Sequence, residues 1–313
     1  MKASSITLDK NISFLFKGAP GFGKTLAAAS FAIDGPIYIA YFDKKKPVEL
    51  VTFFTDKRFG SLAKKILDNI EYEVYGSQNA HEYLNKVISF TKDCRYTTFI
   101  TDSVTNLTAS AVNWSLGFRD PKKGKTDKIN PNAPMMIPDF DEYKVETSLV
   151  TQALDISKTL PCNIIWTAHP LPSIKIEGAG ASLKVTKTNP IVTYGSKVAG
   201  MIPGNFTEIY NFSKLSSWDS SGKSNLKYLV TTESIGDEYA KSPLLGDYIK
   251  EFDITDKLFY HVWKELLDNS SKSRDTESVE LAANKIEVIE LTEREKAARM
   301  LNPFAQPQIG WKI

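Results

Sequence analysis

The chain has 313 residues, of which 42% are hydrophobic and 24% are charged, and its formal net charge is +2 at pH 7. These fractions resemble those of ordinary globular proteins and exclude a disordered chain, while the near-neutral charge excludes an overall basic nucleic-acid-binding surface. No run reaches the roughly 18 apolar residues that a membrane-spanning helix needs, and the first residues contain no long apolar core, so we expect a cytoplasmic protein with no membrane partner.

Short apolar strands alternate with helical segments over the first half of the chain. The segment 12–16 is typical of a buried strand, and the small-residue run 25–33 is typical of a helix. Such alternation indicates an α/β fold with a mainly parallel central sheet and helices on both faces. The predicted strands are 12–16, 36–42, 72–75, 97–102 and 162–169, and the predicted helices are 25–33, 47–55, 61–70, 80–92, 104–117 and 139–160.

The pattern changes after residue 169. The segments 173–178 and 182–188 alternate polar and apolar residues around a glycine-containing centre, which predicts a projecting β-hairpin. The segments 207–212 and 226–232, joined by a polar turn, are predicted to be antiparallel strands added at one edge of the sheet. A predicted helix over 256–267 closes this part of the chain.

Three regions are distinguished by composition. Residues 1–268 are predicted to form one core domain, the polar segment 269–278 a linker, and 279–313 a charged C-terminal helix and tail. The C-terminal helix could pack on the core, on a neighbouring subunit or on a protein partner. Within the core, the proline- and lysine-containing segment 118–138 lacks apolar periodicity and is predicted to be an exposed loop.

Two cysteines occur in the chain, Cys94 and Cys162. They lie within or beside apolar segments and lack the spacing of a metal site. We expect buried free thiols in a reducing compartment.

The segment GAPGFGKT lies between the first predicted strand and the first predicted helix. Bound triphosphates need many hydrogen-bond donors at close range, and the backbone amides of a glycine-rich turn supply them. Lys24 would reach the β- and γ-phosphates, and the Thr25 hydroxyl would ligate Mg²⁺. The alternative is a chance glycine turn. The predicted site for ATP with Mg²⁺ comprises Gly18, Ala19, Pro20, Gly21, Phe22, Gly23, Lys24 and Thr25.

Asp102 ends the apolar strand 97–102. Ligands of parallel sheets bind at the carboxyl ends of the strands, so Asp102 is expected to hold Mg²⁺ through its water shell. The alternative role is to cap the helix that starts at Val104.

These features together resemble the RecA-type ATPases: the glycine-rich turn, a strand ending in Asp102-Ser103, and a later strand ending in Thr167-Ala168-His169. Over residues 12–267 the chain is similar to phage nucleotide-binding proteins with a minimal RecA core, which act in single-strand annealing and recombination. The resemblance implies a RecA-like P-loop NTPase fold and ATP hydrolysis. It also implies a homo-oligomer, ring or filament, and the host cytoplasm if the protein is phage-encoded.

The resemblance further implies roles for individual residues. His169 would be a polar sensor of the γ-phosphate, although a lone histidine at a strand end is usually structural. Asp43 would orient the attacking water, with Glu49 as second choice, because the acidic cluster typical of the family is replaced by DKKK at 43–46. Lys241 would complete the site of a neighbouring subunit, the alternative being a solvated surface lysine.

Two lysine-bearing loops would lie on the nucleotide side of the sheet or next to it, and in the family the loop after the sensor contacts DNA. Clustered lysines neutralise phosphates and release counterions, so binding should weaken with salt. Aromatic residues are sparse apart from the flanking Phe118 and Tyr194, so base stacking has little support. The alternative is a pair of solvated loops on an ATPase with a protein partner. The predicted contacts to single-stranded DNA are Lys122, Lys123, Lys125, Lys175, Lys184 and Lys187.

The leading hypothesis is therefore an ATP-dependent protein that acts on single-stranded DNA in recombination, annealing or replication. One alternative is a hexameric RecA-like helicase or translocation motor. Another is a nucleotide-gated scaffold with little turnover that recruits partners through its C-terminal tail.

Overall fold

The computed structural model describes residues 11–42, 47–119, 137–170, 173–177, 184–188, 190–218, 224–234, 239–246 and 249–270. Asp43, Lys122, Lys123, Lys125 and the predicted C-terminal helix and tail lie outside these ranges. The backbone of the strands that carry Lys175, Lys184 and Lys187 is described, and their side chains are not. The proposed division into core, linker and C-terminal region therefore stays a prediction.

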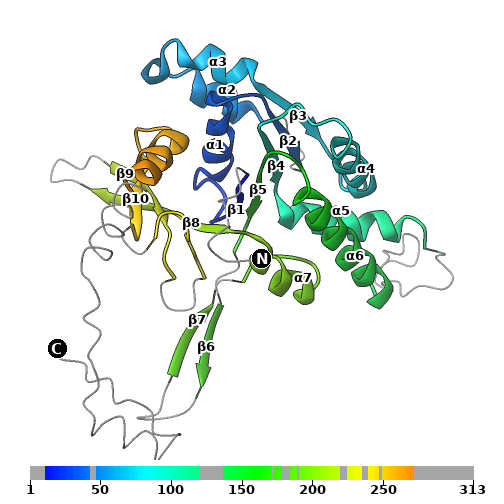
Figure 1. Cartoon of the computed structure of the whole chain (residues 1–313). Helices are drawn as coiled ribbons and strands as arrows, with labels where there is room; N and C mark the ends of the chain where they lie inside the picture. The colour runs from blue at the N-terminus through cyan, green and yellow to red at the C-terminus, as the bar shows by residue number, and fades with distance from the viewer. Residues whose placement is uncertain are drawn as a thin grey trace, which may run out of the picture. The chain divides into compact units, whose positions relative to one another are not determined.

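An eight-stranded mixed sheet forms the centre of the fold, with the order β10-β9-β8-β1-β5-β4-β2-β3 (Figure 1). Neighbouring strands are parallel throughout the run β8-β1-β5-β4-β2-β3. The β8–β9 and β9–β10 pairings are antiparallel. The strands are β1 (Ser13–Lys17), β2 (Ile37–Tyr41), β3 (Ile70–Val74), β4 (Thr98–Asp102), β5 (Asn163–Ala168), β8 (Glu208–Trp218), β9 (Ser224–Thr231) and β10 (Glu251–Asp253).

The central strands are buried on both faces, which explains their nearly continuous apolar sequences. In β1, Phe14 and Phe16 join one hydrophobic cluster, whereas Leu15 joins the other. Successive side chains of a strand point to opposite faces, so one short apolar segment contributes to two cores. The expected α/β sheet is confirmed by this arrangement.

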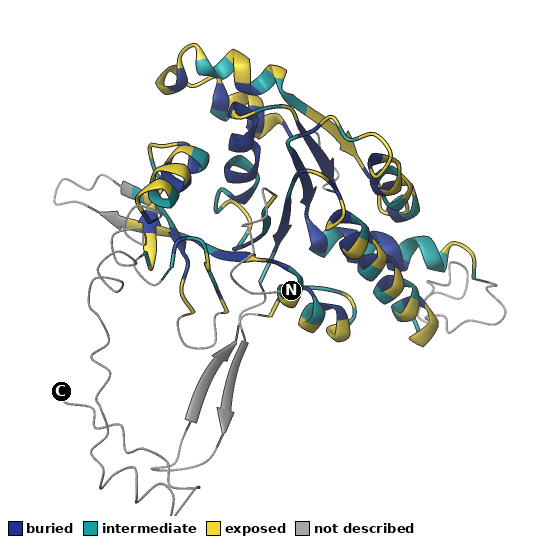
Figure 2. Ribbon diagram, viewed as in Figure 1, coloured by how far each residue is buried: buried dark blue, intermediate teal, exposed yellow. Residues whose placement is uncertain are grey.

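Helices cover both faces of the sheet, as predicted (Figure 1). One core contains residues of α4 (Ala80–Phe90), α5 (Val104–Leu116), α6 (Phe140–Ser157) and α7 (Ser196–Met201). The opposite core contains residues of α1 (Lys24–Ala29), α2 (Val48–Phe54), α3 (Leu62–Asp68) and a helix over 259–270. Figure 2 shows the buried residues concentrated on the strands and the sheet-facing sides of these helices. Among the described residues, no helix combines the length and apolar character needed to cross a membrane.

The β-hairpin predicted from the segments 173–178 and 182–188 is confirmed, and its strands are antiparallel. It consists of β6 (Ser173–Glu177) and β7 (Lys184–Thr188), paired from Ser173 with Thr188 to Glu177 with Lys184. The two strands form a sheet of their own.

The antiparallel pairing predicted for 207–212 and 226–232 is confirmed, but the sequence did not predict the parallel neighbour of the first of these segments. This segment starts β8, which is parallel to β1 and lies directly beside it; the antiparallel pairing is with β9. The two strands also extend into the predicted polar turn, because Trp218 pairs with Ser224. Among the α-helices and strands of the described residues, α7 and β10 had no sequence prediction, since both are too short to establish a periodic pattern.

Candidate functional site

The glycine-rich turn joins β1 to α1, and its glycines are required for different structural reasons. Gly21 and Gly23 have φ values of 77° and 86°, in the left-handed region that other residues rarely adopt. Gly18 packs against β8, where an added Cβ atom would lie 2.7 Å from the carbonyl oxygen of Phe212. The turn therefore needs glycine twice for its backbone conformation and once for close packing.

Lys24 lies at the start of α1, and its side chain folds back along the turn. Its Nζ atom donates hydrogen bonds to the carbonyl oxygens of Gly18 at 2.8 Å and Ala19 at 3.1 Å. The same Nζ atom lies 3.3 Å from Nδ1 of His169, the residue that follows β5. Lys24 is only 4% exposed, so the turn encloses a positive charge.

Asp102 lies next to the turn although 77 residues separate it from Thr25 in sequence. The Thr25 hydroxyl donates a hydrogen bond to Oδ2 of Asp102 at 2.5 Å. The Thr167 hydroxyl of β5 donates to the other carboxylate oxygen. Because β5 lies between β1 and β4, their carboxyl ends bring the turn, Thr167 and Asp102 together. The N-cap position of α5 belongs to Ser103, not to Asp102.

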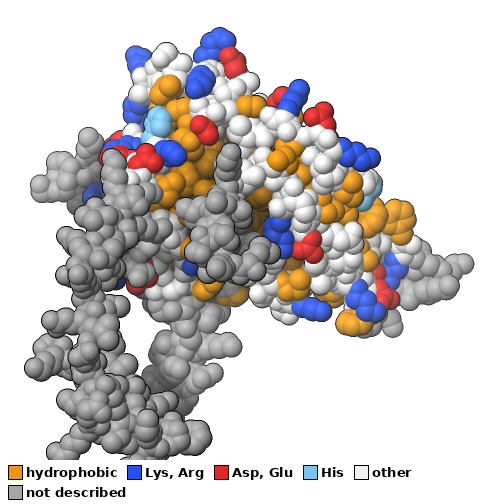
Figure 3. All heavy atoms as spheres, in the orientation of Figure 1, with side chains coloured by type: hydrophobic (Ala, Val, Ile, Leu, Met, Phe, Trp, Pro, Cys, Tyr) orange, Lys and Arg blue, Asp and Glu red, His pale blue; other side chains and the backbone are white. Residues whose placement is uncertain are grey.

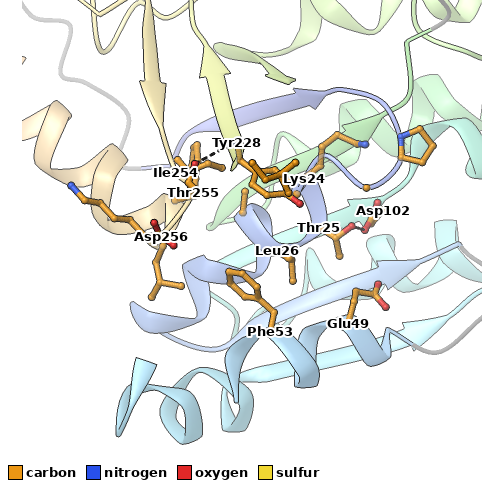
Figure 4. Close-up of a pocket in the computed structure, with 18 of the residues that line it drawn as sticks. Lys24, Thr25, Leu26, Glu49, Phe53, Asp102, Tyr228, Ile254, Thr255 and Asp256 are labelled. Atoms are coloured by element: carbon orange, nitrogen blue, oxygen red, sulfur yellow. Dashed lines mark hydrogen bonds between the residues drawn. The ribbon is translucent and has the colours of Figure 1, made fainter. Parts of the chain in front are cut away.

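A cavity of about 830 Å³ extends from this point across the carboxyl edge of the sheet (Figure 4). One end is lined by Lys24, Thr25, Asp102 and His169. The other end is lined mainly by apolar and aromatic residues, with a few polar side chains. These include Phe53 of α2, Leu226 and Tyr228 of β9, and Ile254, Thr255, Asp256 and Phe259. Pockets for drug-sized ligands and cofactors occupy about 300–1,000 Å³, so this cavity is large enough for a nucleotide.

Glu49 is the described acidic residue of α2 that lines the cavity, and Figure 4 shows it on the Thr25 side of Phe53. Its Oε1 atom accepts a hydrogen bond from the Tyr41 hydroxyl at 2.8 Å, which orients the carboxylate. Glu49 was the second choice for a water-orienting carboxylate. Asp43, the first choice, lies outside the described residues.

Lys241 does not line the cavity. Its backbone pairs with Ile209 in β8, through hydrogen bonds of 2.8 and 3.1 Å. The neighbouring Glu208 is buried, and this burial raises the pKa of its carboxyl group; the positive charge of Lys241 opposes the shift. A role for Lys241 in the site of another subunit stays a prediction.

A second groove, of about 650 Å³, lies between α6 and the residues around Tyr194. Glu146 of α6 is buried and accepts the backbone N–H of Gly195 at 3.1 Å, which holds this segment against the helix. The rims carry the exposed side chains of Phe140 and Tyr194. The groove is lined by Phe140, Tyr143, Lys144, Thr147, Ser148, Thr151, Gln152, Tyr194, Gly195, Ser196 and Lys197.

The groove lies where both predicted DNA-binding segments join the core. The segment 118–138 leads into α6, and Arg119 ties its two ends together through the carbonyl oxygen of Ile137 at 3.0 Å and Glu142 at 3.2 Å. The hairpin 173–188 leads into the segment at Tyr194. The sequence predicted Tyr194 only as an aromatic residue flanking a loop, because its proximity to α6 is a tertiary contact.

Several cavity residues were not predicted from sequence, among them Tyr41, Tyr228, Thr255 and Asp256. Thr167 was named only as part of a strand end. No local sequence pattern predicted its position next to Asp102. Comparison of the chain with protein-family models and with curated proteins finds no match.

Proposed function

We propose that this protein binds ATP with Mg²⁺ and hydrolyses it as a RecA-like P-loop ATPase. The observation that carries the proposal is the hydrogen bond between Thr25 and Asp102, formed beside the Lys24 ammonium. It joins the end of β4 to the first turn of α1, at the carboxyl edge where ligands of parallel sheets bind. The long cavity that opens from this point supports a whole nucleotide as ligand.

Hard oxygen donors suit Mg²⁺, and the Thr25 hydroxyl and the Asp102 carboxylate are such donors. Among the described residues, no group of three or more His, Cys, Asp or Glu side chains gathers to hold a metal. That is compatible with Mg²⁺, which keeps several waters and binds through one or two protein oxygens plus phosphate oxygens. When bound, the ion would neutralise charge that develops on the transferred phosphoryl group.

Each part of the site has a distinct task in this proposal. The turn amides and Lys24 bind the phosphates, and Lys24 would exchange its carbonyl partners for phosphate oxygens. His169 lies beside Lys24 at the same end of the cavity, and in this proposal it responds to the presence of a phosphate. The aromatic rings of Phe53 and Tyr228 at the far end provide surfaces for the base.

Hydrolysis also needs a group that orients the attacking water, and Glu49 meets this need among the described residues. Replacing Glu49 by Gln is expected to lower the ATP turnover rate at least about tenfold while leaving ATP affinity within about twofold. The amide keeps the size of the side chain and can still accept a hydrogen bond from Tyr41. Phosphate release and nucleotide titration measure the two effects.

The matched variant for this test is Asp43→Asn, which removes the other candidate carboxylate. If Asp43→Asn loses turnover and Glu49→Gln does not, the roles are reversed. If both variants hydrolyse ATP at the wild-type rate, neither carboxylate orients the water.

Single-stranded DNA is the proposed macromolecular partner, and the groove between α6 and Tyr194 favours it. Exposed Tyr194 offers a face on which a base can stack, the Lys144 ammonium lies over the Phe140 ring at 4.3 Å from its centroid, and Lys197 adds positive charge. Lys144 is paired with Asp141 at 3.2 Å, so Lys197 is the better phosphate ligand. On the face shown in Figure 3, basic and acidic side chains of the described residues are interspersed, so binding depends on such local sites.

Replacing Lys197 by Ala is expected to weaken binding of a single-stranded oligonucleotide severalfold at low salt. The slope of log affinity against log salt concentration should fall in magnitude by about 1, because one phosphate contact is lost. Fluorescence anisotropy over a salt series measures both. Lys64→Ala, which removes an exposed lysine of α3, is the control. Absence of any wild-type binding at low salt, with or without ATP, would remove DNA from the proposal.

The oligomeric assembly and the choice among the candidate functions are tested by comparing activities. We propose a homo-oligomer, ring or filament, in which Lys241 reaches a neighbouring site, and a protein partner for the C-terminal tail. Turnover with and without single-stranded DNA separates the candidate functions. Stimulation without unwinding favours recombination or annealing, unwinding favours a helicase motor, and negligible turnover favours a nucleotide-gated scaffold.

A further inference from the structure

Cys94 and Cys162 are brought together at the amino-terminal ends of β4 and β5. Cys162 directly precedes β5, Cys94 lies shortly before β4, and the first pair of residues in this part of the sheet is Thr98 with Asn163. Both thiols are free, and their Sγ atoms are 3.9 Å apart. The expectation of two buried thiols is correct for Cys162, whereas Cys94 is only partly buried.

We propose that this pair is a redox modification site, which a small disulfide such as glutathione disulfide converts into an intramolecular disulfide. A disulfide bond is about 2.05 Å long, so the sulfur atoms must approach by roughly 2 Å. Cys162 is held in place by its neighbour Asn163, whose backbone N–H donates to the Thr97 carbonyl oxygen and whose side chain accepts from the backbone of Ile12, both at 2.9 Å. Cys94 lies in the loop between α4 and β4, which supplies the movement.

The two thiols are unequal, and this sets the order of the reaction. The sulfur–sulfur contact with Cys162 lowers the pKa of Cys94 below its usual value, so the partly exposed thiol is the one that ionises more readily. Interaction with Cys94, together with burial, raises the pKa of Cys162. Cys94 is therefore the sulfur that meets and attacks an external reagent.

The chemistry is two successive thiol–disulfide exchanges. The Cys94 thiolate attacks one sulfur of the small disulfide, forms a mixed disulfide and releases one thiolate. Cys162 loses its proton to solvent and attacks Sγ of Cys94, which releases the second thiolate. The protein pair loses two electrons, and the reagent is reduced to two thiols.

The site lies at the opposite edge of the sheet from the nucleotide cavity. β4 runs from Thr98 near the thiols to Asp102 at the cavity, a span of about 13 Å at ~3.3 Å per residue. The cross-link would close the long chain segment between residues 94 and 162 and restrict the unfolded state. It should therefore raise the unfolding temperature by several degrees and leave nucleotide affinity unchanged, whatever nucleotide is bound.

The test treats the folded full-length protein with glutathione disulfide at pH 7.5. Expected results are loss of both thiols, a mass decrease of about 2 Da, and a protease-derived peptide in which Cys94 is linked to Cys162. Dithiothreitol should restore both thiols and the original unfolding temperature. Wild-type protein that stops at a mixed disulfide, forms only intermolecular dimers or does not react would overturn the proposal.

Single-cysteine variants test the order of attack. Cys162→Ala should stop at the mixed disulfide on Cys94, with a mass increase of about 305 Da, and react more slowly at neutral pH because it lacks the partner that lowers the Cys94 pKa. Cys94→Ala should react only after unfolding. Rapid reaction of Cys162 in the folded Cys94→Ala variant would contradict this order. Thermal unfolding checks that each variant is folded. If either variant is unfolded, peptide mapping of the wild-type protein decides the proposal.

Discussion

Replacing Lys24 by Ala is expected to raise the dissociation constant for ATP by at least about 100-fold, the largest effect on binding that we predict. The ammonium lies inside the turn, only 4% exposed, and charge-assisted hydrogen bonds to phosphate in such a site are strong. A hundredfold change corresponds to about 2.7 kcal/mol, which the loss of such contacts can supply. Isothermal titration with ATP in the presence of Mg²⁺ measures the constant.

Two further variants separate this effect from damage to the fold. Lys24→Gln keeps a donor for the carbonyl oxygens of Gly18 and Ala19 but removes the charge, so it should also lose ATP binding while remaining folded. Lys64→Ala removes an exposed lysine outside the cavity and should bind as the wild type does. Wild-type affinity in a folded Lys24→Ala protein would disprove the phosphate site and the ATPase proposal.

The second large effect is expected on turnover. Replacing Asp102 by Asn should reduce Mg²⁺-dependent ATP hydrolysis by at least roughly 100-fold, because the ion that neutralises the transferred phosphoryl group loses its anionic protein partner. Chelation of Mg²⁺ should reduce wild-type turnover to the same low level. The carboxamide keeps the size of the side chain and an oxygen that accepts a hydrogen bond from Thr25 or Thr167.

Nucleotide titrations with and without Mg²⁺ locate the defect. The wild type should bind ATP more tightly with Mg²⁺ than without it, and Asp102→Asn should lose this difference while keeping the metal-free affinity. Asp141→Asn, at the exposed start of α6, is the matched control and should behave as the wild type. An unchanged Mg²⁺ dependence of turnover in Asp102→Asn would exclude Asp102 from the metal site.

Both experiments depend on one tertiary contact, that of Thr25 with Asp102. Either residue alone has an ordinary explanation, a hydroxyl in the first turn of a helix or a carboxylate at the end of a strand. Their hydrogen bond holds an acidic oxygen in the same cavity as the enclosed Lys24 ammonium, and that combination supports the proposal of a phosphate and a divalent ion bound together.

The amino-acid sequence by itself determined the parts whose physics is local. Gly21 and Gly23 adopt φ values that favour glycine, and the apolar runs of β1, β4 and β5 suit strands buried on both faces. The start of α6 is local as well, because Asp139 and Glu142 form a capping box there. These features depend on neighbours within a few residues, so one sequence is enough to predict them.

Tertiary structure alone decided the strand order, the apolar end of the cavity and the approach of the two thiols. β8 lies beside β1 and parallel to it, whereas the sequence predicted only its antiparallel pairing with the segment that forms β9. Tyr228 and Ile254 reach the cavity because β9 and β10 are joined to the sheet through β8, which lies beside β1, a strand distant in sequence. Periodicity reports which face of a strand is buried and leaves open which strand lies next to it, because that choice depends on packing between segments far apart in the chain.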